Sequence, residues 1–362
     1  MSNGTCFILY NIAMQLWTTY CPKKISWEIT TARNNGKAGD SSWMNNTDII
    51  SDSLALLKKS GIDGIRLVIY PEELSYDGKK FDWKPVETML DLAKKHRLLV
   101  DLCIGPFQYP NYPGIYVPPK LLDHVFANGR CLDTTPELKE YAERFLEKQL
   151  ERYGDDTRIR GFHFANEWPD KQKVQGKREV LTCVSEAFMH QSARYLIKHT
   201  HKPILLNTNI DAGDRRRLRS HLRPLATILG KQGRIGFDVY PSQETWKKAF
   251  FQKLQRLIEP YTWSYRKARK LFDPCQLFFC EVEAQPWGGG RSWYHYITHA
   301  TDPKVNVIQY ENTSLSQTMN RYIIPSQATE ISLWGADFCL VAHELGITWP
   351  LKQIKEIKNS ES

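Results

Sequence analysis

The chain has 362 residues, of which 41% are hydrophobic and 12% aromatic, enough to bury one large core or two smaller ones. Its formal net charge is +9, and basic residues gather in runs at 215–219 and 266–270. Both runs fall on predicted helices, where such runs usually form a solvated face, and neither is interleaved with aromatic residues. The composition therefore argues against nucleic acid as a partner.

The eight cysteines form no CxxC pair and no Cys/His cluster with the spacing of a zinc site. We therefore expect reduced thiols, no metal and no cofactor. Residues 6–10 are apolar, but they lack the preceding basic segment and the following cleavage site of a secretory signal. No run approaches the roughly 18 apolar residues of a membrane span. The sequence thus predicts a cytoplasmic protein without a membrane partner and leaves its oligomeric state open.

Helix-like and strand-like segments alternate from residue 47 onward. A helix is predicted to start at Thr47 and to stop at Gly61. Residues 105–133 are rich in Pro, Tyr and Gly and predict an elaborate loop. One apolar run predicts a strand that ends in Asn166-Glu167. The remaining strands are predicted at 64–70, 98–104, 203–208, 234–240, 276–281 and 330–334, and the remaining helices at 85–96, 136–153, 177–200, 246–271 and 314–327.

Regular alternation of strands and helices is typical of a parallel sheet. Seven such strands and one N-terminal strand, expected within residues 5–16, make the eight strands of a closed (β/α)8 TIM barrel. The chain shows no repeat and no linker, so residues 1–362 are interpreted as a single barrel domain. This interpretation leaves an irregular segment at about 17–46, which is long for a loop, and a misplaced first strand is the alternative explanation.

The notable polar residues all fall at the C-terminal ends of predicted strands. In TIM barrels, this end of the strands carries the active site. In the order of strands two to eight, these residues are Arg66 and Tyr70, Gln108 and Tyr109, Asn166 and Glu167, Asn207 and Asn209, Asp238 and Tyr240, Glu281, and Trp334.

Glu167 and Glu281 each end an apolar run, where a carboxylate is costly unless it is hydrogen-bonded or used in chemistry. They are far apart in the sequence and can face each other only if the sheet closes. Retaining glycoside hydrolysis needs two carboxyl groups about 5–5.5 Å apart, one to protonate the leaving oxygen and one to attack the anomeric carbon. The pair therefore suggests a glycosidase. His163 shares strand parity with Glu167 and is interpreted as a core histidine.

In their order and spacing, over about residues 60–340, these residues resemble the retaining glycoside hydrolases of clan A, which include β-galactosidase-like and cellulase-like members. The resemblance implies a (β/α)8 barrel in which Glu167 is the acid/base and Glu281 is the nucleophile. It also implies that Arg66 supports the nucleophile and that Trp334 lies under the sugar.

The same resemblance covers further substrate-binding positions. Asn166 is expected to hydrogen-bond the 2-hydroxyl of the sugar. The segment Asp238-Val-Tyr240-Pro241 is similar to a strand-six pattern in which the tyrosine contacts the nucleophile, although the family more often has histidine at the position of Asp238. The expected binding residues are completed by Gln108, Asn207 and, in the segment Gln285-Pro-Trp-Gly, Trp287.

The sequence thus predicts a retaining β-glycosidase that acts on a carbohydrate. A transglycosidase on the same barrel and a catalytically silent carbohydrate-binding barrel are the alternatives. Glu283 has the same strand parity as Glu281 and is its rival as nucleophile, and we expect Arg66 and Tyr240 to contact Glu281. On a purely structural interpretation, Glu167 would stabilise a helix N-terminus and Glu281 would be a salt-bridged rim residue.

Overall fold

The computed structural model describes residues 14–110, 114–125, 130–210, 214–239, 261–283, 293–298 and 328–359, together with Leu315, Met319, Ile323 and Ser326. For residues 178, 179, 261–264, 283 and 296 it describes the backbone alone.

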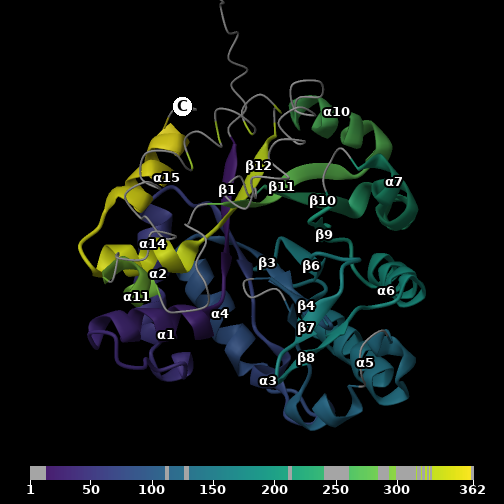
Figure 1. Ribbon diagram of the computed structural model, residues 1–362, viewed down its shortest axis with the longest axis horizontal. Coiled ribbons are helices and arrows are strands. Elements are labelled where there is room, and N and C mark those ends of the chain that lie inside the picture. The colour runs from purple at the N-terminus through teal and green to yellow at the C-terminus, as the bar shows by residue number, and fades with distance from the viewer. Residues whose placement is uncertain are drawn as a thin grey trace, which may run out of the picture.

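Eight parallel strands form a closed barrel with helices around it (Figure 1). Each barrel strand pairs with the barrel strand before it in the chain, and the first pairs with the last. The expected fold class, a (β/α)8 TIM barrel, is confirmed. The barrel strands are β1 (Gln15–Tyr20), β2 (Gly64–Leu67), β3 (Leu99–Cys103), β6 (Gly161–Ala165), β9 (Ile204–Thr208), β10 (Gly233–Val239), β11 (Gln276–Glu283) and β12 (Glu330–Trp334).

The strands are buried on both faces because side chains fill the barrel and helices cover its outside. Every residue of β6, β9 and β12 is buried. Buried residues of α5, such as Leu138, Ala142 and Phe145, recur every three or four positions and give this helix one apolar face. The longer helices are α1 (Pro22–Arg33), α2 (Thr47–Lys59), α4 (Lys84–Lys95), α5 (Pro136–Tyr153), α6 (Glu186–His199), α8 (Arg223–Leu229), α10 (Tyr261–Phe272), α14 (Ala336–Glu344) and α15 (Trp349–Asn359).

The shorter helical segments lie in the connections between these elements. They are α3 (Pro71–Leu74), α7 (Arg215–Arg217), α11 (Trp293–Thr298), the 3-10 helices Trp43–Asn45, Pro119–His124, Leu132–Thr134 and Gly230–Gln232, and a π-helical turn at Leu218–Leu222.

The N-terminal expectation was wrong in two respects. The first strand, β1, runs from Gln15 rather than within residues 5–16, and α1 lies inside the segment 17–46 that was expected to be irregular. Because Thr18 and Thr19 are buried in the barrel, β1 looks less apolar in sequence than its burial would suggest. Helix α1 begins at a proline, whose missing N–H is not needed in the first turn. The single-domain organisation stays a prediction.

Two loops at the C-terminal end of the barrel build a second, smaller sheet. The helix predicted from residue 177 begins only at Glu186, where the side chain of Ser185 caps it. The residues before it form a hairpin, which turns at Gly176 with a φ of 88°. The sequence prediction missed this turn. In sheet order, the strands are β4 (Gln108–Tyr109), β5 (Gly114–Ile115), β7 (Gln172–Val174) and β8 (Lys177–Thr182).

Two predicted helices lie partly or mostly outside the described residues. The C-terminal half of the helix expected at 246–271 is α10, whereas the helix expected at 314–327 is described at isolated positions only. In the part of the chain that the structure describes, no helix combines the length and the apolar character needed to cross a membrane. The cytoplasmic location stays a prediction.

Candidate active site

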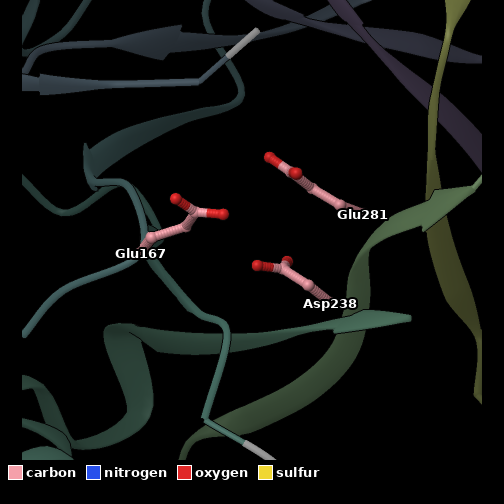
Figure 2. Close-up of side chains that lie close together, drawn as sticks. All are labelled: Glu167, Asp238 and Glu281. Carbon is pink, nitrogen blue, oxygen red and sulfur yellow. The ribbon is translucent and has the colours of Figure 1, made fainter. Parts of the chain in front are cut away.

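Three carboxyl groups meet at the C-terminal end of the barrel strands, those of Glu167, Asp238 and Glu281 (Figure 2). Their closest carboxyl oxygens all lie within 4.8 Å of one another. Glu167 follows β6, Asp238 lies near the end of β10, and Glu281 lies near the end of β11. The two glutamates therefore face each other, as expected from the sequence, and Asp238 adds a third carboxyl group beside them.

A β-bulge brings Glu281 and Asp238 side by side. Along the β10–β11 pair, Phe237 lies opposite Phe279, but the next pair is Asp238 with Glu281, so Cys280 is an extra residue in β11. A regular register would have placed Glu281 opposite Val239. The bulge thus decides which strand-six residue Glu281 meets.

Glu167 lies in a tight turn after β6. Its φ of 52° is left-handed, a conformation that is costly for a residue with a side chain and that often occurs at functional sites. Gln172 Nε2 donates a hydrogen bond to Glu167 Oε2 at 3.2 Å, and the backbone N–H of Glu167 donates to Asn207 Oδ1 at 3.4 Å. The Trp168 indole N–H donates to the carbonyl of Val184 at 3.1 Å. These contacts hold the turn, and with it the carboxyl group.

Arg66 provides the positive charge next to Glu281. Its guanidinium is buried, with Nη2 at 3.4 Å from Glu281 Oε1 and Nη1 at 2.7 Å from Cys280 Sγ. Arg66 also donates a hydrogen bond to Thr19 Oγ1 in β1. The expected contact between Arg66 and Glu281 is confirmed. The contact sets a positive charge beside the carboxyl group that is expected to act as the nucleophile.

A chain of buried hydrogen-bonded groups leads from His163 through Asn207 to Asp238. His163 Nε2 lies 2.9 Å from Asn207 Oδ1 and 3.0 Å from the carbonyl of Ala165. Because both partners are acceptors, Nε2 carries the hydrogen. Asn207 Nδ2 donates to the two oxygens of Asp238 at 3.2 and 3.3 Å. Burial and the charge of Arg66 lower the pKa of His163 to about 3, so this histidine is neutral and structural.

Carboxyl groups that lie this close together disfavour one another's ionisation. Burial, followed by the charges of Glu281 and Asp170, raises the pKa of Glu167 to about 8. Burial, followed by the charges of Glu281 and Glu167, holds the pKa of Asp238 well above its usual range. The protonated forms of Glu167 and Asp238 are therefore favoured, whereas the guanidinium of Arg66 lies next to Glu281.

Two further expected binding residues carry buried acceptors. Asn166 is 1% exposed, and its Oδ1 has no hydrogen-bond partner among the described residues. The same holds for Oε1 of Gln108, whose Nε2 donates to the carbonyl of Asp170 at 3.4 Å. A buried acceptor without a partner is costly, so both atoms are suited to accept a hydrogen bond from a ligand.

The remaining expected residues have different outcomes. Trp334 ends β12 and is 9% exposed. Tyr240 and Trp287 lie outside the described residues, as does the side chain of Glu283. The choice between Glu281 and Glu283 as nucleophile therefore rests on the contact of Arg66 with Glu281.

Sequence reasoning missed three supporting contacts. Thr19 was missed because the first strand was placed too early, and Gln172 because the hairpin was predicted as loop and helix. The link from His163 to Asn207 joins two strands, and no local pattern reports such a contact.

Among the described residues, Glu167, Asp238 and Glu281 also form the group that is close enough to hold a metal ion. Carboxylate oxygens suit hard cations. However, the buried guanidinium of Arg66 already supplies positive charge at Glu281, and the raised pKa values of Glu167 and Asp238 favour protons on the other two groups. The residues present therefore fit a proton-sharing site better than a metal site.

No protein-family model matches the chain. Solved structures with a similar fold include an exo-β-1,4-mannosidase from Opitutaceae bacterium strain TAV5 (TM-score 0.56, 13% identity, 96% of this chain and 59% of that one). A cold-adapted β-galactosidase from Rahnella sp. R3 has a TM-score of 0.56 at 10% identity, over 96% of this chain and 56% of that one. A GH5_18 protein from Bifidobacterium longum subsp. infantis has a TM-score of 0.56 at 12% identity, over 95% and 79%.

These likenesses show the fold of the chain, a (β/α)8 barrel shared with glycosidases. The chain spans 59% of the length of the mannosidase and 56% of the length of the β-galactosidase.

Proposed function

We propose that this protein is a retaining β-glycosidase that hydrolyses a β-linked glycoside through a covalent glycosyl-enzyme intermediate. The observation that carries the proposal is the approach of the Glu167 and Glu281 carboxyl oxygens to within 4.8 Å of each other. Retaining enzymes hold their two carboxyl groups about 5–5.5 Å apart, whereas inverting enzymes leave about 6.5–9.5 Å for a water molecule. The short separation favours direct attack by one of the two groups.

The surroundings of the two glutamates support a role for each of them in this proposal. Glu281, beside Arg66, attacks the anomeric carbon as a carboxylate, while Glu167, whose pKa is raised to about 8, gives its proton to the leaving oxygen. The aglycone leaves as an alcohol and the sugar stays bound to Glu281. In the second step, Glu167 takes a proton from water, the water oxygen attacks the anomeric carbon, and the bond to Glu281 breaks.

The buried acceptors support a polyhydroxylated ligand. Asn166 Oδ1 and Gln108 Oε1, which lack partners among the described residues, are suited to accept hydrogen bonds from sugar hydroxyls. Trp334 at the end of β12 is suited to lie under the sugar ring. The structurally similar mannosidase and β-galactosidase support the class, β-glycosidase, and differ from each other in the sugar named. No metal or cofactor is needed for the two steps.

Two alternatives keep the same barrel. A transglycosidase would pass the glycosyl group from Glu281 to an acceptor alcohol instead of water. A silent carbohydrate-binding barrel would need neither a protonated Glu167 nor a charge beside Glu281, and the presence of both favours an enzyme.

The test combines a panel of aryl β-glycosides with variants of the two glutamates. Glu281→Ala should abolish hydrolysis of every glycoside, because the attacking group is gone. Glu167→Ala should keep the first step with dinitrophenyl glycosides, which leave without a proton, and should accumulate the intermediate. Azide should then release a β-glycosyl azide from the Glu167 variant. Product identity is read by NMR, and each assay is repeated with a chelator, which should have no effect.

Glu151→Ala is the matched control, because this glutamate lies on the exposed face of α5 and its removal should leave all rates unchanged. An α-glycosyl azide from the Glu167 variant would reverse the two roles. Binding of sugars without turnover by the wild type would establish the silent barrel, and products formed on added alcohols in preference to water would establish the transglycosidase.

A further inference from the structure

Cys131 and Cys183 lie next to each other at the rim of the barrel, with 3.2 Å between their sulfur atoms. Cys131 lies in the loop that leads to α5, and Cys183 follows β8 directly. Two sulfur atoms must approach to about 2.05 Å to form a disulfide, a movement of about 1.2 Å that side-chain rotation can supply.

The backbone around the two cysteines is already joined. The N–H of Leu132 donates to the carbonyl of Cys183 at 3.0 Å. On one side of this bond, Thr182 Oγ1 donates to the carbonyl of Arg130. On the other side, the N–H of Ser185 donates to Asp133 Oδ1 at 2.8 Å. Segments 130–133 and 182–185 thus run side by side, so a cross-link between them requires no rearrangement of the chain.

Exposure distinguishes this pair from the other described cysteines. Cys131 and Cys183 are both partly exposed, so reagents can reach them. The other described cysteines are buried, and buried thiols in apolar surroundings are inert. These are Cys21, Cys103, Cys275, Cys280 and Cys339.

We propose that Cys131 and Cys183 form a disulfide site, oxidised by small disulfides such as glutathione disulfide, that ties the β7–β8 hairpin to the loop before α5. One thiolate of the pair attacks a sulfur of glutathione disulfide, and a glutathione thiolate leaves. The other thiolate then attacks the mixed disulfide, and the second glutathione thiolate leaves. The two protons released by the cysteines end on the two glutathione thiolates.

The environment favours the persistence of the disulfide once it has formed. Burial and the neighbouring Cys183 raise the pKa of Cys131 to about 12. A thiol with a high pKa is a poor leaving group, so a disulfide that contains it resists reduction. The enclosed segment contains α5, β6 and Glu167, and closing a long segment stabilises the folded chain by restricting the unfolded one.

The cross-link also lies close to the carboxyl site. Gln172 at the start of the hairpin contacts Glu167, and Val184, the residue after Cys183, accepts the hydrogen bond of Trp168. A disulfide at this place therefore restrains two of the contacts that hold the turn of Glu167.

The test uses the purified full chain, treated with glutathione disulfide or dithiothreitol, alkylated in the native state and digested for mass spectrometry. The oxidised wild type should yield a linked peptide containing Cys131 and Cys183, two hydrogen masses lighter than the separate peptides. Its Tm should rise by about 5 °C. Trypsin should cleave the native hairpin near Lys177 several-fold more slowly than in the reduced protein.

Cys183→Ser should lose the linked peptide and every redox effect, whereas the matched control Cys275→Ser, at a buried thiol, should keep them. The peptide measurement on the wild type requires no variant to fold. Free or separately glutathionylated Cys131 and Cys183 in the oxidised wild type would overturn the proposal. So would a linked peptide with unchanged Tm and unchanged trypsin cleavage.

Discussion

At the scale of single residues, the carboxyl site is governed by the burial and the closeness of its three carboxyl groups. Arg66 is the cation in contact with Glu281, while three carboxyl groups share a space less than 5 Å across. Burial, followed by the charges of neighbouring carboxylates, raises the pKa values of Glu167 and Asp238. This arrangement leads to two predictions about how the activity depends on pH.

For a glycoside with a poor leaving group, kcat/KM should fall as the pH rises through about 8, the pKa of Glu167. The sign follows from the role of this group as an acid, since its protonated form is the active one. A dinitrophenyl glycoside needs no proton for the first step, so its alkaline limb should vanish or move to higher pH. Steady-state rates between pH 5 and 10 check this, and identical alkaline limbs for both substrates would contradict it.

Asp238→Asn should keep activity within about tenfold of the wild type, because asparagine copies the shape and neutrality of a protonated Asp238. The alkaline limb should stay in place. If Asp238 were ionised, removing its charge would lower the pKa of Glu167, and the limb would shift down by about 1–3 pH units. Asp170→Asn is the positive control, because the charge of Asp170 does raise the pKa of Glu167.

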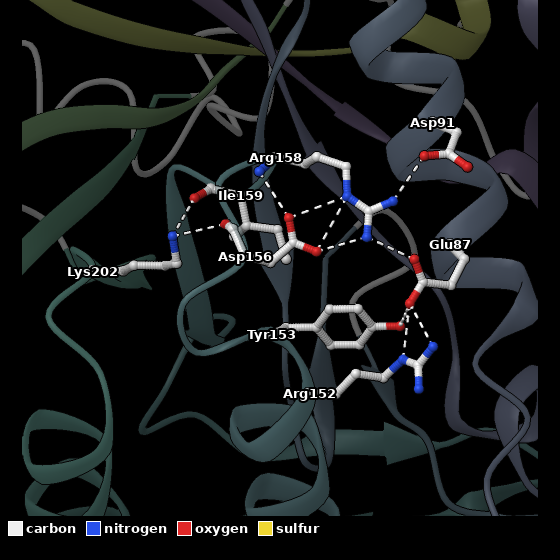
Figure 3. A network of polar contacts seen from close by, with 8 residues as sticks. All are labelled: Glu87, Asp91, Arg152, Tyr153, Asp156, Arg158, Ile159 and Lys202. Carbon is white, nitrogen blue, oxygen red and sulfur yellow. Dashed lines mark hydrogen bonds and ion pairs between the residues drawn. The ribbon is translucent and has the colours of Figure 1, made fainter.

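At the scale of elements, a network of charges fixes the start of β6, the strand that leads to Glu167 (Figure 3). Arg158, just before β6, contacts Glu87 at 2.6 Å and Asp91 at 2.8 Å on α4, and Asp156 at 2.6 Å in its own loop. Lys202, just before β9, donates to the backbone carbonyls of Asp156 and Ile159. The network also includes Arg152 and Tyr153 at the end of α5, which contact Glu87.

Arg158→Ala should lower the free energy of unfolding by about 1–2 kcal/mol, because a multiply paired guanidinium in a network contributes more than an isolated surface pair. The kcat should not change, since the network lies at the opposite end of β6 from Glu167. Urea unfolding measures the loss. Lys148→Ala, which breaks one exposed pair with Glu151, should leave the free energy of unfolding almost unchanged. Equal losses for the two variants would contradict the role of the network.

At the scale of the whole molecule, buried ion pairs cross the barrel interior and join distant strands. Arg234 on β10 pairs with Asp101 on β3 at 2.6 Å and with Glu330 on β12. Arg160, just before β6, also pairs with Glu330 at 2.7 Å, and its guanidinium lies 4.6 Å from the ring centre of Trp17 on β1. These contacts link the strands β1, β3, β10 and β12 and the start of β6, five of the eight strands of the barrel.

Arg234→Met should lower the free energy of unfolding by about 3–5 kcal/mol, because it leaves the buried carboxylate of Asp101 without its ion-pair partner. Adding Asp101→Asn to this variant should recover part of the loss, because the group left without a partner is then neutral. Glu330 keeps its contact with Arg160 in both variants. Chemical denaturation provides the values. A loss below about 1 kcal/mol, or no recovery in the double variant, would show that the pair contributes little.

The sequence by itself determined most of the barrel elements and their order, because these depend on local patterns. Apolar runs that end in polar residues located the strands β2 to β12 of the barrel, and helical spacing located α2, α4 and α5 closely. Strand order then placed Glu167 and Glu281 at one end of the barrel, since parallel strands present their C-terminal ends on the same side. The resemblance to clan A glycosidases added the roles of these residues.

Only the tertiary structure decided what surrounds the two glutamates. The bulge at Cys280 sets Glu281 beside Asp238, the hairpin brings Gln172 to Glu167, and β1 supplies Thr19 to Arg66. Each of these contacts joins two segments whose local sequence patterns are independent of each other. A local pattern therefore cannot predict the contact. The sharing of protons among the three carboxyl groups depends on the distances between their oxygen atoms, and only the folded chain sets those distances.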